Sequence, residues 1–421
     1  MDTSIKIAAN TIIQGLGKLI TASTTFVVVV LVSRALGASG YGDFVKIFAV
    51  VEIFYLITDF GLNAIAVKYI TQKEDRAKEV MSNLLAIRLA MSVVLILVVV
   101  VVSALLPYQN GQGFSPQVKL GILAASLTIL TQAMLLTNNA FFQAILRYDK
   151  MVIAQTIGSA LKLSLIFFVT RSQVDIFVLT WSLIAADTVM VVASFYQLIG
   201  KLGWVFPKLI KRIALSFIKE SWPLGLSLVF TQIYFRIDTV ILGIFRPAVE
   251  VGLYNLAYRF FDLALVAPIF FTNALYPVLI KQYQIGMANF IKSALISSGV
   301  LLLAGITATA GLTIFGPLAI SWFFGQEFLG SVDALVIFAW QLPVFYLTSL
   351  LMWILIVLGR QKLLIFFYGS GAVLNVVLNL YFIPLYGYLA AAIITGFSEV
   401  YILILLLLAN IKIIKSKKPI N

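Results

Sequence analysis

Long apolar runs recur along the whole chain and are separated by short polar segments. A helix that crosses a bilayer needs roughly 20 predominantly apolar residues, and each run is long enough to supply one. The pattern predicts twelve membrane-spanning helices, at residues 12–33, 44–67, 82–106, 119–146, 151–170, 175–199, 213–242, 251–280, 290–315, 331–358, 363–383 and 387–411. The first run lacks a small-residue cleavage site and leads directly into further spans, which favours a retained helix over a signal peptide.

Five of these spans carry polar residues at helical spacing. Residues three or four positions apart lie on the same side of a helix, so each set forms one polar face. The sets are Gln14, Lys18, Thr21 and Thr25; Glu52, Tyr55, Asp59 and Asn63; Gln132, Asn139 and Gln143; Gln155, Ser159 and Lys162; and Asn255, Arg259 and Asp262. Charged groups inside a bilayer are costly and usually face protein or water. The faces therefore predict either a wet central cavity or hydrogen-bonded contacts between helices.

The composition excludes an ordinary soluble protein. Hydrophobic residues make up 62% of the chain and charged residues 11%, with a mean hydropathy of +1.05, whereas soluble domains are about 45–50% apolar and about 25% charged. The absence of Cys and His removes disulfides, thiol nucleophiles, imidazole bases and the usual zinc ligands. The connecting segments are too short for a soluble catalytic domain. We therefore expect a transporter rather than an enzyme, with no metal site and no resident cofactor.

The chain has a net charge of +13, and the positions of its basic residues indicate its orientation in the membrane. Lys and Arg concentrate in alternate connecting segments and in the C-terminal tail. The segments expected on the outer side hold Arg34, Lys46, Lys119, Arg171 and Arg246. Because short basic loops stay in the cytoplasm, both termini are expected to be cytoplasmic. The charge requires no nucleic-acid partner.

The sequence repeats weakly at a separation of 213 residues. The aligned pairs are Arg147 with Arg360, Gly158 with Gly371, Leu161 with Leu374, Tyr41 with Tyr254, and Lys68 with Lys281. Six spans in each half give both halves the same orientation, as in transporters built from parallel repeats. We therefore predict an all-α polytopic membrane protein in which two parallel six-helix lobes, residues 1–205 and 206–421, surround a central cavity.

Basic and amide residues within the spans are candidates for binding an anionic substrate. Arg236 and Arg259 lie at similar depths in successive helices, and guanidinium groups bind phosphate or carboxylate through planar, permanently charged forks. The candidate cavity cations are Arg236, Arg259, Arg34, Lys18 and Lys162, and the candidate polar lining residues are Gln232, Asn255 and Asn139. The alternative is that these side chains only hold helices together.

Six intramembrane carboxylates are candidates for coupling to Na⁺ or H⁺, or for salt bridges. They are Glu52, Asp59, Asp187, Asp238, Asp262 and Glu399. Asp262 lies one turn from Arg259 and could neutralise it. Asp238 lies two residues from Arg236, hence on a different face of the helix, where it would pair with another helix. We prefer the salt-bridge role for Asp238 and Asp262.

Several motifs, in order along the chain, carry a family resemblance. They are Ser33-Arg34-Ala35-Leu36-Gly37 with Gly40-Tyr41-Gly42; Arg236-Ile237-Asp238 with Leu242-Gly243 and Gly252-Leu253-Tyr254; Gly325-Gln326-Glu327-Phe328; and Asn379 to Pro384 with Gly387. Together these stretches resemble Wzx-type polysaccharide flippases, which transport O-antigen and capsule repeat units within the multidrug/oligosaccharidyl-lipid/polysaccharide exporter superfamily. The last motif departs from the family pattern because no Gly follows Gly387-Tyr388-Leu389.

The resemblance implies a twelve-helix transporter of the bacterial cytoplasmic (inner) membrane. Its substrate would be an undecaprenyl-pyrophosphate-linked oligosaccharide, moved from the cytoplasmic to the periplasmic leaflet by alternating access with ion coupling. Cavity cations would hold the pyrophosphate, and the amides would face the sugars. Polysaccharide polymerase and chain-length proteins are candidate partners beside membrane lipid.

Three other functions remain as alternatives. The first is a multidrug or organic-cation exporter of the same superfamily, which would use the carboxylates rather than the arginines. A lipid-linked glycan polymerase or glycosyltransferase is less favoured, because the longest outer segment, near residues 107–118, contains no Asp or Glu. A purely structural role is the third.

Overall fold

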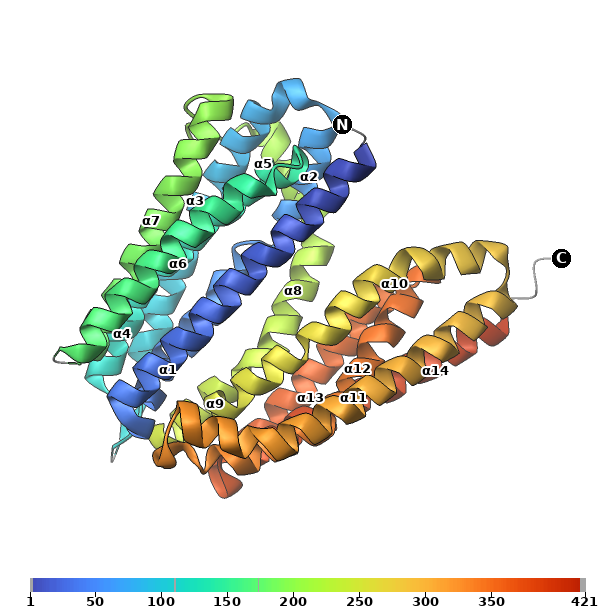
Figure 1. The fold of residues 1–421 in the computed structure, drawn as a ribbon. Coiled ribbons are helices and arrows are strands. Elements are labelled where there is room, and N and C mark those ends of the chain that lie inside the picture. The colour runs from blue at the N-terminus through green and yellow to red at the C-terminus, as the bar shows by residue number, and fades with distance from the viewer. Residues whose placement is uncertain (1–2, 110, 173, 417–421) are drawn as a thin grey trace. The chain divides into compact units, whose positions relative to one another are not determined.

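The computed structural model describes residues 3–109, 111–172 and 174–416, and these residues form a helical protein (Figure 1). The helices of the first half are α1 (Thr3–Ile57), α2 (Leu62–Gln72), η1 (Glu74–Arg76), α3 (Ala77–Leu105), α4 (Pro116–Ala125), α5 (Leu127–Ala144), α6 (Tyr148–Arg171) and α7 (Ile176–Leu202). The later helices are α8 (Lys211–Phe245), α9 (Ala248–Ala264), α10 (Val266–Ile285), α11 (Met287–Phe323), η2 (Gln326–Phe328), α12 (Ser331–Val357), α13 (Lys362–Tyr386) and α14 (Tyr388–Ser416). A two-stranded antiparallel hairpin, β1 (Tyr108–Gln109) and β2 (Gln112–Gly113), follows α3.

The predicted number of membrane spans is confirmed. Eleven helical segments in the described residues are long and apolar enough to cross a bilayer, and the first of them, Ile13–Tyr55, has 43 residues. At 1.5 Å per residue this segment is about 65 Å long, roughly twice the hydrocarbon thickness. Its backbone breaks at Gly37, where φ is 66° and ψ is −179°. The segment therefore counts as two spans, and the total is twelve.

The predicted second span, 44–67, is wrong as a continuous helix. The helical backbone ends at Ile57 and resumes at Leu62. Between them Phe60 and Gly61 have φ values of 37° and 73°, in the left-handed region that breaks a helix. The apolar pattern continues through this break because Phe60 and Gly61 are both compatible with a buried position, so hydropathy alone does not reveal it.

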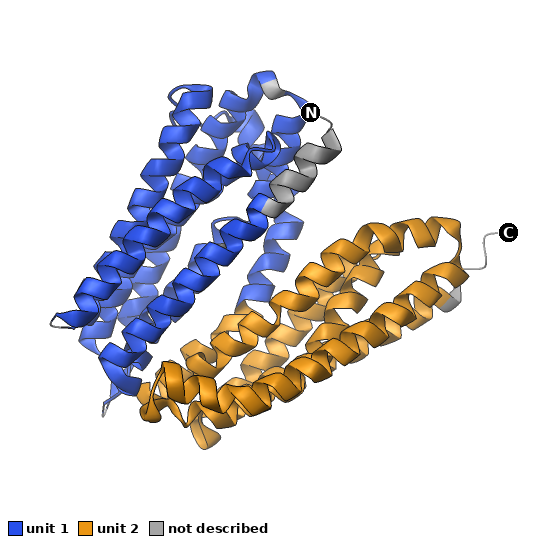
Figure 2. Ribbon diagram, viewed as in Figure 1, with its two compact units in different colours: residues 1–232 blue, residues 233–421 orange. Residues whose placement is uncertain are grey.

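The chain forms two compact units, residues 1–232 and 233–421 (Figure 2). The boundary falls inside α8, later than the predicted seam at 205/206. The first half of α8 packs against α2 of unit 1: Lys68 Nζ donates to Glu220 at 2.9 Å, and the Tyr69 hydroxyl lies 2.8 Å from Ser216 Oγ. The Tyr69 and Phe217 rings stack with centroids 5.4 Å apart. These contacts assign the first turns of α8 to the N-terminal unit.

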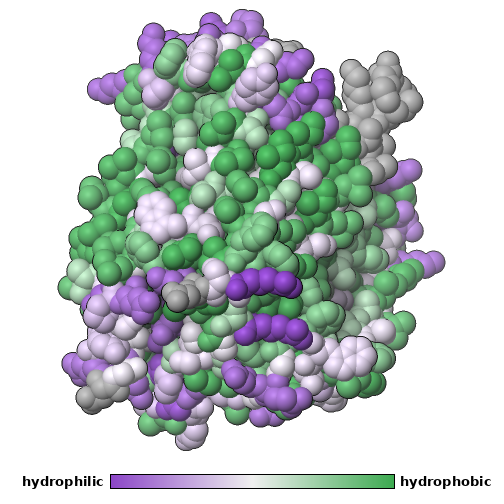
Figure 3. All heavy atoms as spheres, turned by 60° about the vertical axis from the view of Figure 1, so that its left-hand side comes forward, coloured by the Kyte–Doolittle hydropathy of each residue, from purple (hydrophilic) through white to green (hydrophobic). Residues whose placement is uncertain are grey.

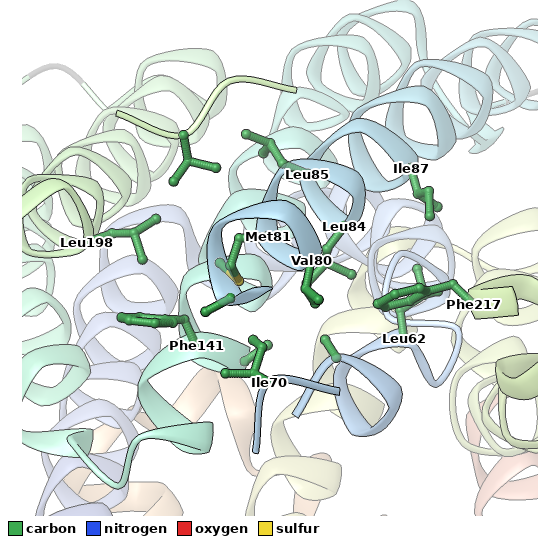
Figure 4. Close-up of a cluster of buried hydrophobic side chains, with 14 of the residues drawn as sticks. Leu62, Ile70, Val80, Met81, Leu84, Leu85, Ile87, Phe141, Leu198 and Phe217 are labelled. Atoms are coloured by element: carbon green, nitrogen blue, oxygen red, sulfur yellow. The ribbon is translucent and has the colours of Figure 1, made fainter. Parts of the chain in front are cut away.

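Each unit has its own buried core. In unit 1, a cluster from α2, α3, α5 and α8 includes Leu62, Met81, Leu84, Phe141 and Phe217 (Figure 4). In unit 2 the core is aromatic. Its rings, drawn from α9 and α12, pack with centroids 4.9 to 5.8 Å apart and belong to Tyr254, Tyr258, Phe261, Phe338 and Phe345.

Large apolar side chains also remain outside these cores. On α3, Leu97, Val101 and Leu105 are 59%, 59% and 77% exposed. On the face drawn in Figure 3, hydrophobic residues cover a broad central area and hydrophilic ones gather toward its two ends. Such apolar exposure is unfavourable in water and is expected where lipid is the solvent. The chain is thus an all-α polytopic membrane protein.

The internal repeat is visible in the packing within each unit. A Cβ added to Gly158 of α6 would lie 2.7 Å from Met190 of α7, and one added to Gly371 of α13 would lie 2.8 Å from Ile402 of α14. Both distances are shorter than real Cβ contacts. The aligned glycines therefore allow the same close approach of two successive helices in each half.

Candidate functional site

Arg236 is a partly accessible cation on α8, beside α9. One of its terminal nitrogens lies 3.3 Å from Asp262 Oδ2, and its guanidinium carbon lies 5.5 Å from the centroid of the Tyr258 ring. The side chains of Arg236 and Asp262 are 21% and 33% exposed. A ring face attracts a cation through its quadrupole. The guanidinium is therefore held between a carboxylate and an aromatic ring without being buried.

Asp262 makes its ion pair with a neighbouring helix. The sequence suggested Arg259, one turn earlier on α9, as its partner, and the structure places Arg236 of α8 at this carboxylate. Arg259 is half-buried. The salt-bridge role predicted for Asp262 is thus observed, with a partner that helical spacing on one element could not identify.

Asp238 is buried and receives hydrogen bonds from nearby donors. The Tyr254 hydroxyl of α9 donates to Oδ2, while the Thr239 backbone N–H donates to Oδ1 at 2.6 Å. Asp238 is 1% exposed. The carboxylate therefore faces another helix, as its offset from Arg236 predicted. Its described partners are two hydroxyl groups and a backbone N–H rather than a cation.

The other polar candidates of unit 2 lie in helix contacts. Asn255, predicted to line the cavity, is 5% exposed, and its amide nitrogen donates to Val251 O at 3.0 Å and to Thr239 Oγ1 at 3.4 Å. This burial removes it from a substrate-facing position. Glu399 of α14 is also buried and accepts a 2.7 Å hydrogen bond from the Tyr234 hydroxyl of α8. Both side chains connect helices within unit 2.

Two amide candidates are half-buried. Gln232 lies on α8, where its Nε2 atom is buried and has no hydrogen-bond partner among the described residues. Asn139 lies on α5, beside the fully buried Asn138, whose amide nitrogen donates to Ser194 Oγ of α7 at 2.7 Å. Of the two adjacent asparagines, Asn138 is therefore the one that holds α5 to α7.

Unit 1 contains a buried arginine that belongs to none of the predicted polar faces. Arg88 of α3 has no exposed side-chain surface and lies 2.8 Å from Asp59 Oδ1, at the break between α1 and α2. Its second terminal nitrogen lies 3.3 Å from Thr137 Oγ1. Asp59 also accepts the Asn63 backbone N–H at 3.2 Å. The signal was present in the sequence, because Arg88 is a lone cation within the apolar run 82–106.

Lys162 and Asp187 form an ion pair between α6 and α7. The distance from Nζ to Oδ1 is 2.9 Å, and each side chain is 23% exposed. Lys162 was predicted as a cavity cation, and Asp187 as a coupling group or salt-bridge partner. Their geometry gives each a charged partner within unit 1.

The candidates on α1 differ in exposure. Lys18 and Arg34 are exposed, and Glu52 is half-buried. Lys46, expected in an outer connecting segment, is instead 2% exposed inside α1, which is a correction. Its ammonium lies 3.2 Å from Asp43 and donates to the Gly113 carbonyl of β2 at 2.9 Å. Lys46 thus holds the hairpin against α1.

A family profile matches residues 7–283, about two thirds of the chain, and its description is polysaccharide biosynthesis protein. The chain belongs to this family. The curated Shigella dysenteriae protein named "Putative O-antigen transporter" is 25% identical to it over 397 residues, which cover 91% of this chain and 95% of the relative.

The chain is also similar in fold to solved structures of membrane transporters. An inward-facing multidrug resistance MATE transporter of the MOP superfamily has a TM-score of 0.75 at 14% identity, covering 94% of this chain and 96% of the other. Lipid II flippase MurJ, in an inward closed conformation, has a TM-score of 0.73 at 17% identity, covering 97% and 89%. These likenesses show that the fold is the two-lobe transporter fold.

The intramembrane charges of this family member fall into two groups. The first group is buried, and each member is bonded to partners in its own unit. It consists of Arg88 in unit 1 and of Asp238 and Glu399 in unit 2. Arg236 and Asp262 keep exposed surface, as do Lys162 and Asp187. Among the described residues, no group of three or more acidic side chains is arranged so that it could bind a metal ion. The second group is the better candidate for meeting a substrate, because a fully buried charge cannot reach one.

Proposed function

We propose that this protein is a flippase for a lipid-linked oligosaccharide. It moves an undecaprenyl-pyrophosphate-linked glycan from the cytoplasmic to the periplasmic leaflet of the bacterial inner membrane by alternating access of its two lobes, coupled to Na⁺ or H⁺, and performs no covalent chemistry. The observation that carries this proposal is the 25% identity to an O-antigen transporter relative along 91% of the chain.

The substrate's pyrophosphate accounts for the accessible arginines. A pyrophosphate carries at least two negative charges, which lose hydration when they enter a protein cavity and need cations in return. We assign Arg236 and Arg259 to this role, with Arg34 and Lys18 of α1 as further cations and Gln232 and Asn139 as partners for the first sugars. Lys162, with Asp187 at 2.9 Å, is assigned a structural role.

The pairing of Arg236 with Asp262 is compatible with anion binding. A guanidinium has five N–H donors, and the Asp262 contact, at 3.3 Å, uses one terminal nitrogen. The Arg236 side chain also keeps 21% of its surface exposed beside the Tyr258 ring. An arriving phosphate could therefore share or replace the carboxylate at the same group.

Organic-cation export is the second candidate, because a multidrug transporter shares this fold. That function needs accessible carboxylates. Asp238 and Glu399 are instead 1% and 3% exposed and accept tyrosine hydroxyls, and Asp59 and Asp187 are paired with Arg88 and Lys162. Four of the six candidate carboxylates are thus bonded to other side chains of the fold, which favours the anionic substrate.

The test is to locate the lipid-linked glycan in cells that lack the protein. Spheroplasts and inverted membrane vesicles would be treated with an impermeant glycan oxidant, and the oxidised lipid-linked fraction would be measured. Protection in spheroplasts together with oxidation in inverted vesicles supports a flippase. Normal outward display of the glycan, with lost efflux of an organic cation such as ethidium, would overturn it in favour of the exporter.

Partner and topology assignments extend the proposal. Both termini are placed in the cytoplasm, on the basic side of the membrane. The polysaccharide polymerase and chain-length proteins are proposed as neighbours in the membrane, because they use the glycan after it has crossed. Crosslinking from intact cells, followed by identification of the captured membrane proteins, tests that assignment.

A further inference from the structure

The connection between α7 and α8, residues 203–210, is held against the start of α3. The Ile210 backbone N–H donates to Asn83 Oδ1 at 2.6 Å, and the Lys208 backbone N–H donates to Ser82 O at 3.2 Å. Val205 is buried. We call residues 203–210 the linker segment. Because its backbone is bonded to α3, its outward side chains have fixed positions on the molecule.

Aromatic and aliphatic side chains of the linker segment point outward. Trp204, Phe206 and Leu209 are 66%, 70% and 63% exposed. The Trp204 and Phe206 rings stack, with centroids 6.2 Å apart and an interplanar angle of 17°. On α8, which follows the linker segment, Ile218 and Trp222 are about half exposed. This much exposed aromatic surface is unfavourable in water.

Exposed basic side chains lie within the linker segment and next to it along the chain. Lys201, Lys208, Lys211, Arg212 and Lys219 are exposed, and the chain contains no Asp or Glu between Asp187 and Glu220. The ammonium of Lys78, on α3, lies 3.7 Å from the position that a Cβ on Gly203 would occupy. The linker segment itself therefore carries rings and an ammonium group and no acidic side chain, and the nearby Glu220 of α8 is paired with Lys68.

The linker segment lies where a membrane meets water. It follows directly on α7 and precedes α8, and both helices are long and apolar enough to span a bilayer. Trp side chains are enriched at this level because the ring is amphipathic, and Lys and Arg near the surface are attracted to anionic lipid. A purely topological role would require the positive charges but would not require a stacked, exposed aromatic pair.

We propose that the linker segment, with Lys78 and Lys201, is a docking surface for anionic phospholipids. Trp204 and Phe206 enter the boundary between head groups and acyl chains, and Lys201 and Lys208 contact the phosphates. The leaflet is the one that the basic segments face, the cytoplasmic leaflet under the orientation proposed above. The surface does not depend on which substrate is transported. It ties the start of α8 to the lipid surface.

The experiment uses the full chain in vesicles of phosphatidylcholine and phosphatidylglycerol. Either lipid is replaced by its brominated form, which quenches nearby Trp fluorescence. The chain has six Trp residues, so the signal of Trp204 is taken as the difference between the wild type and Trp204→Phe. We expect brominated phosphatidylglycerol to quench Trp204 more strongly than brominated phosphatidylcholine at equal mole fraction.

The double variant Lys201→Gln/Lys208→Gln tests the role of the positive charges. Its Trp204 signal is again taken as the difference between the variant with Trp204 and the same variant carrying Trp204→Phe. Each lysine near an anionic surface contributes about five-fold in affinity, so the preference should fall by about ten-fold or more. Lys362→Gln/Lys412→Gln removes the same charge from exposed positions in unit 2 and should leave it unchanged. Equal quenching by the two lipids, an unaltered preference in the double variant, or no quenching of Trp204 by either lipid would each overturn the proposal.

Asn83→Ala provides a second measurement without a change of charge. Loss of the 2.6 Å hydrogen bond to Ile210 frees the end of the linker segment. The preference of Trp204 for phosphatidylglycerol should fall at least two-fold, while vesicle incorporation and helical circular dichroism stay at wild-type values. An unchanged preference would contradict the claim that the bonded backbone presents the surface.

Discussion

Leu146 and Gly359, 213 residues apart, occupy the same left-handed turn in the two halves of the chain. Their φ angles are 55° and 74°. After Leu146, the Arg147 N–H donates to Phe142 O at 2.9 Å; after Gly359, the Arg360 N–H donates to Leu355 O at 3.0 Å. This is the six-residue hydrogen bond that closes helices through a left-handed residue. The repeat is therefore present in the backbone as well as in the aligned arginines.

The first prediction concerns the cost of this turn. A Cβ disfavours the left-handed conformation. No atom lies within 4 Å of a Cβ added at Gly359, so a substitution there measures backbone strain without a contribution from steric crowding. Gly359→Ala should lower the free energy of unfolding by about 1 kcal/mol, seen as a lower melting temperature in detergent. Gly299→Ala, in α11 with equally open space, should be neutral or stabilising. Equal effects of the two substitutions would refute the strain argument.

The second prediction concerns the accessible arginines. Arg236→Ala and Arg259→Ala should each abolish surface glycan at normal protein level, because the pyrophosphate loses a forked donor. Lys at either position keeps the charge but loses the fork and should rescue only partly. Full glycan display by both Ala variants would remove these residues from the site. Loss of the protein from the membrane would instead indicate a role in helix packing.

The third prediction concerns the buried pair of unit 1. Asp59→Asn leaves Arg88, which has no exposed surface, without its counter-ion, whereas Arg88→Met leaves a carboxylate that is 25% exposed. We expect Asp59→Asn to be the more destabilising, by about 3 kcal/mol, and the double variant to be less destabilised than Asp59→Asn alone. Thermal unfolding of the four proteins in detergent measures this order. Additive effects would contradict a direct coupling.

The fourth prediction concerns Lys162 and Asp187. If the ion pair serves only to join α6 to α7, exchanging the residues in Lys162→Asp/Asp187→Lys should restore the protein level that Lys162→Asp alone lowers, and surface glycan with it. Immunoblots of membranes and glycan staining give the two readouts. A normal protein level without glycan would show that the ammonium must lie on α6, in contact with substrate.

The fifth prediction concerns topology, and the absence of native cysteine makes it simple to test. Ser416→Cys should resist an impermeant thiol reagent in intact spheroplasts and react after permeabilisation, whereas Gln112→Cys should react in both. The reason is that the basic tail stays on the cytoplasmic side. Labelling of position 416 in intact spheroplasts would reverse the orientation.

Hydropathy was sufficient to predict the number of spans, because each span needs about 20 predominantly apolar residues. It did not predict where helices break. The change of direction at Phe60 depends on two backbone angles, and neither changes the apolar pattern. Hydropathy also did not predict the burial of Lys46. The sequence placed this residue in an outer connecting segment, but its ammonium contacts Asp43 and the carbonyl of Gly113, which lies far along the chain.

Helical spacing identified polar faces but not partners. It placed Asp262 near Arg259 on α9, and the structure adds an ion pair between Asp262 and Arg236 of the neighbouring helix, which spacing on one helix does not predict. Arg88 was missed for a different reason. It belongs to no polar stripe, since its neighbours one turn away are apolar or small, and only its isolation in the run 82–106 marks it.

The boundary between the two compact units lies inside α8 and differs from the boundary of the sequence repeat. The sequence repeat divides the chain before α8, yet Phe217 of α8 belongs to the hydrophobic cluster of α2, α3 and α5. A half-length chain cut at the repeat would therefore leave that cluster open to lipid beside Tyr69. Any division of the protein into its two compact units that keeps this cluster closed has to cut within α8, after Phe217.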